Sequence, residues 1–217
     1  MALKRNMSQE EMIAFIDNEL FPQIQKEIKN WIYPKKQTGG YFAVTRQIFC
    51  MVDFLGAVYS GYPLKERKND KNGRNIATSD KAIGFIVKFF EPKITYNRDI
   101  VTKLYKMYRH GLVHLYQPKI LKLSTKKRLA WFFYRGKKHV DEIKIGTDKG
   151  ERIFKNIDHL QVLFSESNKN YNYLVISIDC LYQDFEKAVK QYRDKLVSTK
   201  YLQRNWRTAI NAICKPR

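Results

Sequence analysis

The spacing of apolar residues changes once along the chain, close to Pro118. Before this proline, apolar side chains recur every three or four residues, which is the spacing of a helix that buries one face. After it they gather in short runs rich in aromatic residues, as at 129–134 and 171–178, which is typical of strands. The sequence therefore predicts the α+β class, with an N-terminal up-and-down helical bundle followed by a small antiparallel sheet and C-terminal helices.

Capping residues and prolines set the expected helix limits. Ser8 and Glu11 form a capping-box pattern, and Pro22 is expected to kink or divide the helix that follows. Asn97 is placed to cap the helix that ends before Pro118. The four expected helices are 8–32, 41–59, a third that begins after Thr78 or Ser79 and stops before Pro92, and a fourth from Asn97 to before Pro118, with a loop at 60–76.

The second half of the chain is expected to hold three or four short antiparallel strands. The candidates are the apolar runs at 129–134, 159–164 and 171–178. Asp179 is placed to cap a helix that continues to Leu196, and a basic helix over 199–214 closes the chain. We expect two parts, a bundle at 1–119 and a sheet-and-helix extension at 120–217 that packs on it as one globular unit.

The expected fourth helix carries an arginine and two histidines, Arg109, His110 and His114. Arginine is permanently charged and fits phosphate oxygens through its planar fork. Histidine can take or give a proton near neutral pH. Together these side chains are the minimum set for cleaving a phosphodiester without a metal. A similar pair, Arg152 and His159, stands in a mixed stretch with strand-like runs after it, which suits the pattern less well.

In this context the segment resembles the hallmark motif of the HEPN superfamily, small helical-bundle proteins that include many RNases. That motif is an arginine, commonly followed by Asn, Asp or His, with a histidine after four to six intervening residues. Arg109, His110 and His114 match it. The resemblance spans residues 8–119 as a helical pattern, with a looser likeness in an apolar helix that contains Asp53. The superfamily also includes toxin–antitoxin components, antiphage factors and members without shown catalysis.

The resemblance implies a metal-independent endoribonuclease. The ribose 2′-hydroxyl of the RNA would attack the adjacent phosphorus and leave a 2′,3′-cyclic phosphate and a 5′-hydroxyl. His114 would act as general base or acid, Arg109 would stabilise charge on the phosphoryl oxygens, and His110 would support position or proton transfer. Antiphage defence or a toxin system, with a protein antitoxin or defence partner, is the implied setting. The alternative is a non-catalytic module of the same fold that binds RNA or protein.

Helix geometry adds an expectation about assembly. Residues five apart on an ideal helix are separated by about 140° around the axis and roughly 7.5 Å along it. Arg109 and His114 therefore do not share a face, and one copy would struggle to place both on a single phosphate. A second copy across a two-fold axis would bring two motifs into one cleft, with Gly111 allowing close approach. A homodimer is therefore expected.

Ordinary structural roles compete with these. Arg109 can form a salt bridge at the surface or at the edge of the core, and His114 can be a satisfied bundle histidine. His110 and His114 also have metal-ligand spacing, but the glutamate of a zincin motif is missing, and no metal or cofactor is expected. Asp53 lies in an apolar run, and Arg46, seven residues earlier, lies on nearly the same helical face and can pair with it. Asp53 can instead orient Arg109 or His114.

The formal net charge of +20 is unevenly spread. Residues 61–118 hold twelve Lys and Arg against five Asp and Glu, and residues 119–157 hold twelve against four. Such a field attracts polyanions, with RNA as the leading candidate and DNA or an anionic membrane behind it. Aromatic residues at 131–134 can stack bases, although alternate members are more typical of a core. A basic run that can track a phosphate backbone, or form a solvated loop, comprises Lys119, Lys122, Lys126, Lys127 and Arg128.

Other functional classes find no support in the sequence. Cys50, Cys180 and Cys214 are widely spaced, which argues against a disulfide framework and a structural zinc site. The chain lacks an uncharged apolar run of about 18 residues, and acidic residues follow the N-terminus too soon for a signal peptide. A cytoplasmic location without membrane contact is therefore expected. Glycine-rich nucleotide loops and the nucleophile elbow of α/β-hydrolases do not occur in the sequence.

Overall fold

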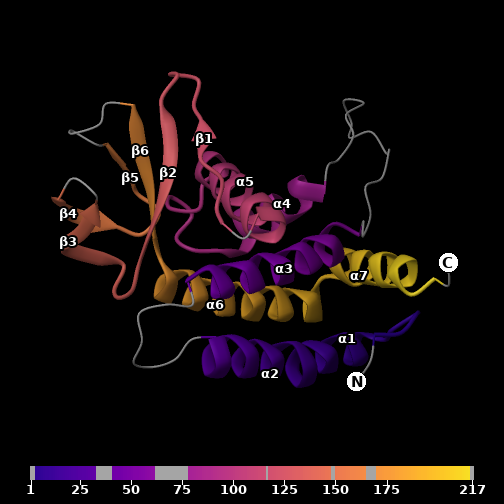
Figure 1. Ribbon diagram of the computed structural model, residues 1–217. Coiled ribbons are helices and arrows are strands. Elements are labelled where there is room, and N and C mark those ends of the chain that lie inside the picture. The colour runs from indigo at the N-terminus through magenta and orange to yellow at the C-terminus, as the bar shows by residue number, and fades with distance from the viewer. Residues whose placement is uncertain are drawn as a thin grey trace. The chain divides into compact units, whose positions relative to one another are not determined.

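The computed structural model describes residues 3–32, 41–61, 78–115, 117–147, 150–164 and 170–215. It shows a mixed α+β protein, as predicted, with helices toward both ends of the chain and strands between them (Figure 1). Most of the expected loop at 60–76 lies outside the described residues. The chain divides into two compact units, but the boundary does not fall at residue 119 as the sequence suggested. One unit combines both ends of the chain, and the other is the segment between them. Unit 1 is Met1–Phe90 with Phe185–Arg217, and unit 2 is Glu91–Asp184.

The N-terminal run of consecutive helical segments belongs to unit 1 and begins at the predicted capping box. The Glu11 amide donates to the Ser8 hydroxyl oxygen at 3.2 Å, and the Ser8 amide donates to the Glu11 carboxylate at 2.9 Å. Pro22 lies in the first turn of a short α-helical segment, where its missing N–H costs least. The winding changes on both sides of Pro22. The run consists of α1 (Gln9–Phe15), the π-helical η1 (Ile16–Leu20), α2 (Phe21–Gln23) and the π-helical η2 (Ile24–Ile32).

Two helices of unit 1 approach closely because a glycine lies at their contact. They are α3 (Tyr41–Ser60) and α4 (Thr78–Phe89), and α4 stops before Pro92 as predicted. A Cβ built on Gly56 of α3 would lie 2.7 Å from the Ala82 nitrogen of α4, closer than side chains approach backbone. The absence of a side chain at Gly56 therefore sets the distance between the two helices.

α3 is also long and apolar enough to cross a membrane, by length and composition alone. More than half of its most apolar window, 56%, is buried inside the protein. Two charged residues, Arg46 and Asp53, interrupt it. This combination is typical of the core helix of a folded unit, and one such helix is weak evidence for a membrane span.

The core of unit 1 includes the end of the chain. α6 (Ile178–Ser198) begins in unit 2 and ends in unit 1, and α7 (Lys200–Ile213) follows it. Trp206 of α7 is fully buried, and its ring centroid lies 6.1 Å from that of Phe15 and 6.0 Å from that of Phe54. The helical unit therefore contains C-terminal helices in place of the fourth helix of the predicted bundle, which belongs to unit 2.

Four strands of unit 2 form a sheet in the order β1–β2–β6–β5 (Figure 1). Strands β1 and β5 run antiparallel to their neighbours, but the central strands β2 and β6 run parallel. The expectation of an antiparallel sheet is therefore wrong for the central pair. The long connection between β2 and β6 supplies the return path that a parallel pair needs. The strands are β1 (Leu121–Lys122), β2 (Arg128–Tyr134), β5 (Val162–Phe164) and β6 (Tyr171–Ser177).

One face of this sheet is covered by α5 (Arg98–Leu115), the helix that carries the predicted motif. Asn97 caps it as predicted, because its side-chain oxygen accepts a hydrogen bond from the Ile100 amide at 3.1 Å. Tyr108 of α5 is fully buried, and its ring centroid lies 5.2 Å from that of Phe133 on β2. The motif helix and the sheet therefore share one core within unit 2.

A hairpin covers the opposite face of the sheet. It consists of β3 (His139–Thr147) and β4 (Gly150–Asp158), which pair antiparallel. Ile157 of β4 joins Tyr134 and Val175 of the sheet in a buried cluster. The sequence does not reveal this hairpin, because charged residues interrupt both strands and leave no continuous apolar run.

Candidate nucleic-acid interface

After α5 the chain folds back against the helix that carries the motif. The Lys119 amide donates to the Met107 carbonyl at 2.9 Å, and the Trp131 indole donates to the Pro118 carbonyl at 3.1 Å. The first bond holds the segment before β1 on the second half of α5, and the second ties that segment to β2. The basic run that follows the motif in sequence is therefore anchored to the same helix.

Gly111 makes this fold-back possible. It is buried, and a Cβ built on it would lie 2.5 Å from both the Gln117 carbonyl oxygen and the Lys119 nitrogen. The nearest atoms all belong to backbone, which cannot swing aside as a flexible side chain can. The close approach that Gly111 allows is therefore within the chain, whereas the sequence suggested an approach to a second copy.

A tight turn brings together the cations of the β1–β2 hairpin. The Leu123 amide donates to the Lys127 carbonyl at 2.8 Å, and the Lys126 amide donates to the Leu123 carbonyl at 3.0 Å. Lys126 takes a left-handed backbone conformation, with φ of 63°. Lys122 is paired with Arg128 across the two strands. Paired residues point to the same face of a sheet, so these two cations are neighbours.

The sheet extends this arrangement to a third strand. Arg128 is in register with Tyr171, the first residue of β6. The Arg128 guanidinium donates to the Tyr171 hydroxyl at 2.8 Å and lies 5.6 Å from the centre of its ring. The Arg128 amide donates to the Asn170 carbonyl at 2.7 Å. Arg128 is thus held at both its backbone and its side chain, which lowers the entropy that it loses when a ligand binds.

A second cation–ring pair stands at the same end of the sheet. Phe164 is the last residue of β5, and the Lys127 ammonium lies 5.9 Å from the centre of its ring. Phe164 is 70% exposed. Because β5 runs antiparallel to β6, the end of β5 lies beside the start of β6. Cations and two aromatic rings therefore gather at one end of the four-stranded sheet.

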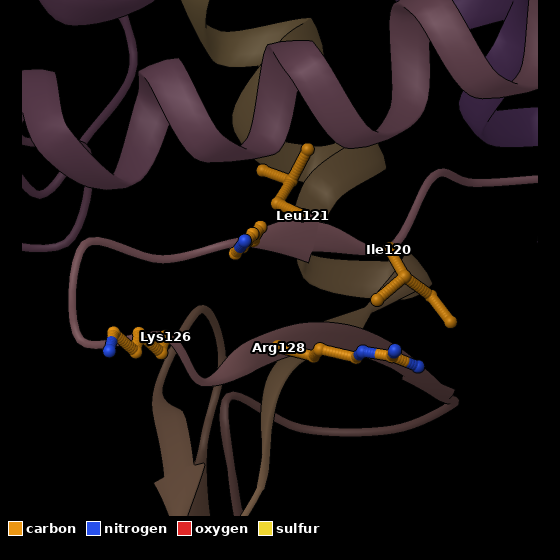
Figure 2. A pocket seen from close by; sticks show the side chains of 5 residues that line it. Ile120, Leu121, Lys126 and Arg128 are labelled. Atoms are coloured by element: carbon orange, nitrogen blue, oxygen red, sulfur yellow. The ribbon is translucent and has the colours of Figure 1, made fainter.

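A pocket of about 410 Å³ opens on the β1–β2 hairpin (Figure 2). Figure 2 shows Lys126 and Arg128 at opposite ends of the opening, with Leu121 pointing away from both. Asp99 and Asp141 enclose a stretch of sequence without any acid but with eleven Lys and Arg. The pocket therefore lies in a field that favours phosphate-bearing ligands. Its described lining residues include no acid and are Ile120, Leu121, Lys122, Lys126 and Arg128.

The structure brings the predicted RNA-binding residues together between the end of α5 and the start of β2. Arg109 lies half-buried on α5, while the side chains of His110 and His114 lie outside the described part of the structure. The position of those two rings relative to Arg109 stays a prediction. Arg46 and Asp53 lie on α3 in unit 1, whereas the motif lies in unit 2. The residues that gather at the hairpin, all exposed apart from the half-buried Lys127, are Lys119, Lys122, Lys126, Lys127 and Arg128.

Unit 2 contains a chain of hydrogen-bonded polar groups, most of them buried, that the sequence does not predict. His159 is 3% exposed, and its Nδ1 accepts a hydrogen bond from the Ser177 amide at 3.0 Å. Because that amide can only donate, the ring proton belongs on Nε2, which lies 3.1 Å from the Tyr96 hydroxyl oxygen. The Tyr96 hydroxyl in turn donates to the Asp184 carboxylate at 2.9 Å. The hydrogen bonds thus run in one direction and end at a carboxylate.

The environment of His159 favours the neutral ring that this pattern requires. Burial lowers its pKa to about 3. Both ring nitrogens have partners within the protein, so neither is left to exchange a proton with a substrate. His159 is therefore a structural histidine. The sequence offers no signal for it, because Tyr96, His159 and Asp184 lie on segments far apart in the chain.

The start of α6 is fastened to Gly136, just beyond the end of β2, by two side chains. The Ser177 hydroxyl oxygen accepts from the Cys180 amide at 3.2 Å, and the hydroxyl donates to the Gly136 carbonyl at 2.8 Å. Ser177 thus caps the helix, a role predicted for Asp179. The Asp179 carboxylate instead accepts from the Gly136 amide at 2.6 Å.

Within the described part of the chain, no group of three or more His, Cys, Asp and Glu side chains is arranged to hold a metal ion. Comparison with known proteins gives no matching family model, curated protein or solved structure. The resemblance to the HEPN superfamily therefore rests on the motif of α5, Arg109, His110 and His114, as it stands in the sequence.

Proposed function

We propose that the protein binds RNA at the basic end of the four-stranded sheet in unit 2. This basic surface consists of the cations of the β1–β2 hairpin and the rings of Tyr171 and Phe164. The observation that supports the proposal best is the register of Lys122, Arg128 and Tyr171 on three neighbouring strands. Cations held on paired strands can meet successive phosphates, and the release of counterions then favours binding. The aromatic ring beside them offers a surface on which a base can stack.

Two features favour a nucleic acid over a general role of the charge in solubility. A cation that serves solubility needs no fixed position, whereas Arg128 is held by hydrogen bonds from its amide and its guanidinium. The stretch between Asp99 and Asp141 also lacks any acid of its own to neutralise its cations. RNA is proposed over DNA because the motif on the adjoining helix suits chemistry that needs a 2′-hydroxyl.

Salt-dependent binding tests this proposal. A fluorescently labelled RNA is titrated at several salt concentrations with the wild-type protein and with Lys122→Gln/Lys126→Asn, in which Asn tolerates the left-handed backbone. Each lost phosphate contact should reduce the slope of log affinity against log salt by about 0.7 to 0.9. The matched control, Lys187→Gln/Lys200→Gln, removes two exposed charges from unit 1. Equal weakening by both double variants would refute a defined surface.

A second proposal is that the bound RNA is cleaved by the motif on α5. It is supported by the hydrogen bond from Lys119 to Met107, which anchors the basic surface on the helix that carries the motif. The substrate 2′-hydroxyl would attack the phosphorus without a metal. His114 would transfer protons, Arg109 would stabilise the phosphoryl oxygens, and His110 would assist. Such an endoribonuclease suits antiphage defence or a toxin system in the cytoplasm.

Cleavage is tested with labelled RNA in EDTA and with DNA of the same sequence. We expect products that end in a 2′,3′-cyclic phosphate, from RNA alone. The His114→Ala variant should cut nothing and should keep nearly the wild-type affinity for RNA, because general acid–base chemistry is lost and the basic surface is not. A requirement for a divalent metal, or cleavage of DNA, contradicts the mechanism. A wild-type protein that binds RNA and never cuts it is the non-catalytic module.

We also propose that two copies pair to complete the catalytic site. On an ideal helix, Arg109 and His114 point about 140° apart, so a composite site needs one residue from each copy. Sedimentation equilibrium at physiological salt should give the mass of a dimer. A strict monomer at high protein concentration removes the composite site while leaving RNA binding by the sheet intact.

A further inference from the structure

We infer that the RNA taken by this surface is single-stranded, with unpaired bases stacked at the two cation–ring pairs, Arg128–Tyr171 and Lys127–Phe164. The inference rests on the proposed RNA binding and names the class of RNA. It depends on where the rings lie, because phosphates alone do not distinguish a single strand from a duplex.

Phe164 is the first half of the evidence. The residue is 70% exposed, more than the other exposed aromatic residues of the described chain, Phe42 and Tyr201. It ends a strand rather than a loose loop, so the backbone of β5 holds the ring in place. An isolated exposed apolar residue needs no explanation, but this one has a lysine ammonium at 5.9 Å from its centre. A base on the ring would therefore have its phosphate close to a cation.

The Arg128–Tyr171 pair is the second half. The guanidinium is a plane that stacks bases as an aromatic ring does, and its hydrogen bond to the Tyr171 hydroxyl fixes that plane. Lys122 lies beside Arg128 on the same face of the sheet, and Lys126 lies at the turn that joins their strands. Two phosphate-binding ammonium groups therefore border a flat surface, which is the combination found in sequence-tolerant binders of single strands.

Strand alternation places the two pairs on opposite faces at the same end of the sheet. Phe164 is in register with Asn172, so its side chain shares a face with that residue, whereas Tyr171 is the neighbour of Asn172 and points the other way. A flexible single strand can pass around the end of a sheet and reach both faces. A stiff duplex cannot bend around one strand end, and it keeps the faces of its bases stacked inside the helix.

Ring variants separate this inference from the proposal on which it rests. The probes are an unstructured labelled RNA and the same strand annealed to its complement, at one salt concentration. Wild-type protein should bind the single strand at least about tenfold more tightly, and Phe164→Leu, which keeps an apolar side chain, should weaken it about 5- to 100-fold. The same change should leave duplex affinity and the salt slope unaltered. Phe164→Trp should restore binding, and Tyr171→Phe, which keeps the ring, should weaken it less than Tyr171→Leu.

The other possible outcomes contradict either the inference alone or the proposed function as well. If duplex and single strand bind equally, or if Phe164→Leu weakens both alike, the inference is wrong while the basic surface stands on the Lys122→Gln/Lys126→Asn result. If neither RNA binds, the proposed function itself fails. Vesicles of phosphatidylcholine with phosphatidylserine serve as a third probe. If they bind more tightly than RNA and depend on Phe164, the surface meets a membrane and not a nucleic acid.

Discussion

Replacing Gly111 by alanine tests how the basic surface is attached to the motif helix. The new Cβ would lie 2.5 Å from two backbone atoms and 2.7 Å from a third, the Pro118 Cα, so either α5 or the returning chain must shift. Such overpacking costs about 1–3 kcal/mol, and alanine recovers about 0.5–1 kcal/mol through its higher helix propensity. We therefore expect the free energy of unfolding to fall by about 1–2 kcal/mol.

The matched control is Gly84→Ala in α4. A Cβ at Gly84 would meet only the Tyr59 ring, at 3.9 Å, so that variant gains propensity without a clash and should be stabilised by about 0.5–1 kcal/mol. Urea unfolding followed by circular dichroism measures both variants. Hydrogen exchange locates the effect, because the Lys119 amide bonded to Met107 should exchange faster in Gly111→Ala and unchanged in Gly84→Ala. Equal stability of the two variants, with Lys119 still protected, would refute the close approach at Gly111.

Three further changes probe the rest of the fold. Gly56→Ala should destabilise unit 1 by about 1–2 kcal/mol in urea unfolding, because the clash of its Cβ with α4 outweighs the gain in helix propensity. Tyr96→Phe removes the oxygen between His159 and Asp184 and should cost about 1–3 kcal/mol, whereas Tyr201→Phe, at an exposed tyrosine, should cost almost nothing. Below about pH 6.5 the unfolded chain protonates His159, but the folded protein does so only near its pKa of about 3. As the pH falls from about 6.5 to about 3, the free energy of unfolding should therefore decrease by up to about 1.4 kcal/mol per pH unit. In His159→Gln, which has no group titrating there, the decrease over this range should be smaller than in the wild type.

Local signals explain most of what the sequence predicted correctly about the fold. Capping residues act within one turn, so Ser8 and Asn97 placed the starts of two helices, and Pro118 placed the end of another. Pairing between distant segments leaves no comparable mark in one sequence. Only the structure therefore shows that β2 pairs with β6 in parallel. Only the structure likewise shows that the helical unit contains α7 and not α5.

The candidate site likewise combines residues that a local pattern predicts with residues that only the pairing of distant strands brings together. The hairpin cations from Lys119 to Arg128 are neighbours in sequence, so a local charge run was enough to find them. The rings that complete the surface, Tyr171 and Phe164, come from strands whose order in the sheet differs from their order in the chain. An alternating pattern could place each ring on a strand, but only the sheet register sets Tyr171 beside Arg128.

Two histidines outside the motif, His159 and His139, are unsuited to transfer a proton during cleavage. His159 has both ring nitrogens engaged inside unit 2 and a pKa lowered to about 3, so it is ruled out as a base near neutral pH. His139 is 52% exposed, but its Nδ1 lies 3.1 Å from the Asp158 carboxylate and its Nε2 lies 3.5 Å from that of Asp141. Two carboxylates beside that ring repel a phosphate. Metal-independent cleavage would therefore fall to the histidines of α5, and His139→Ala should cut RNA at the wild-type rate where His114→Ala does not.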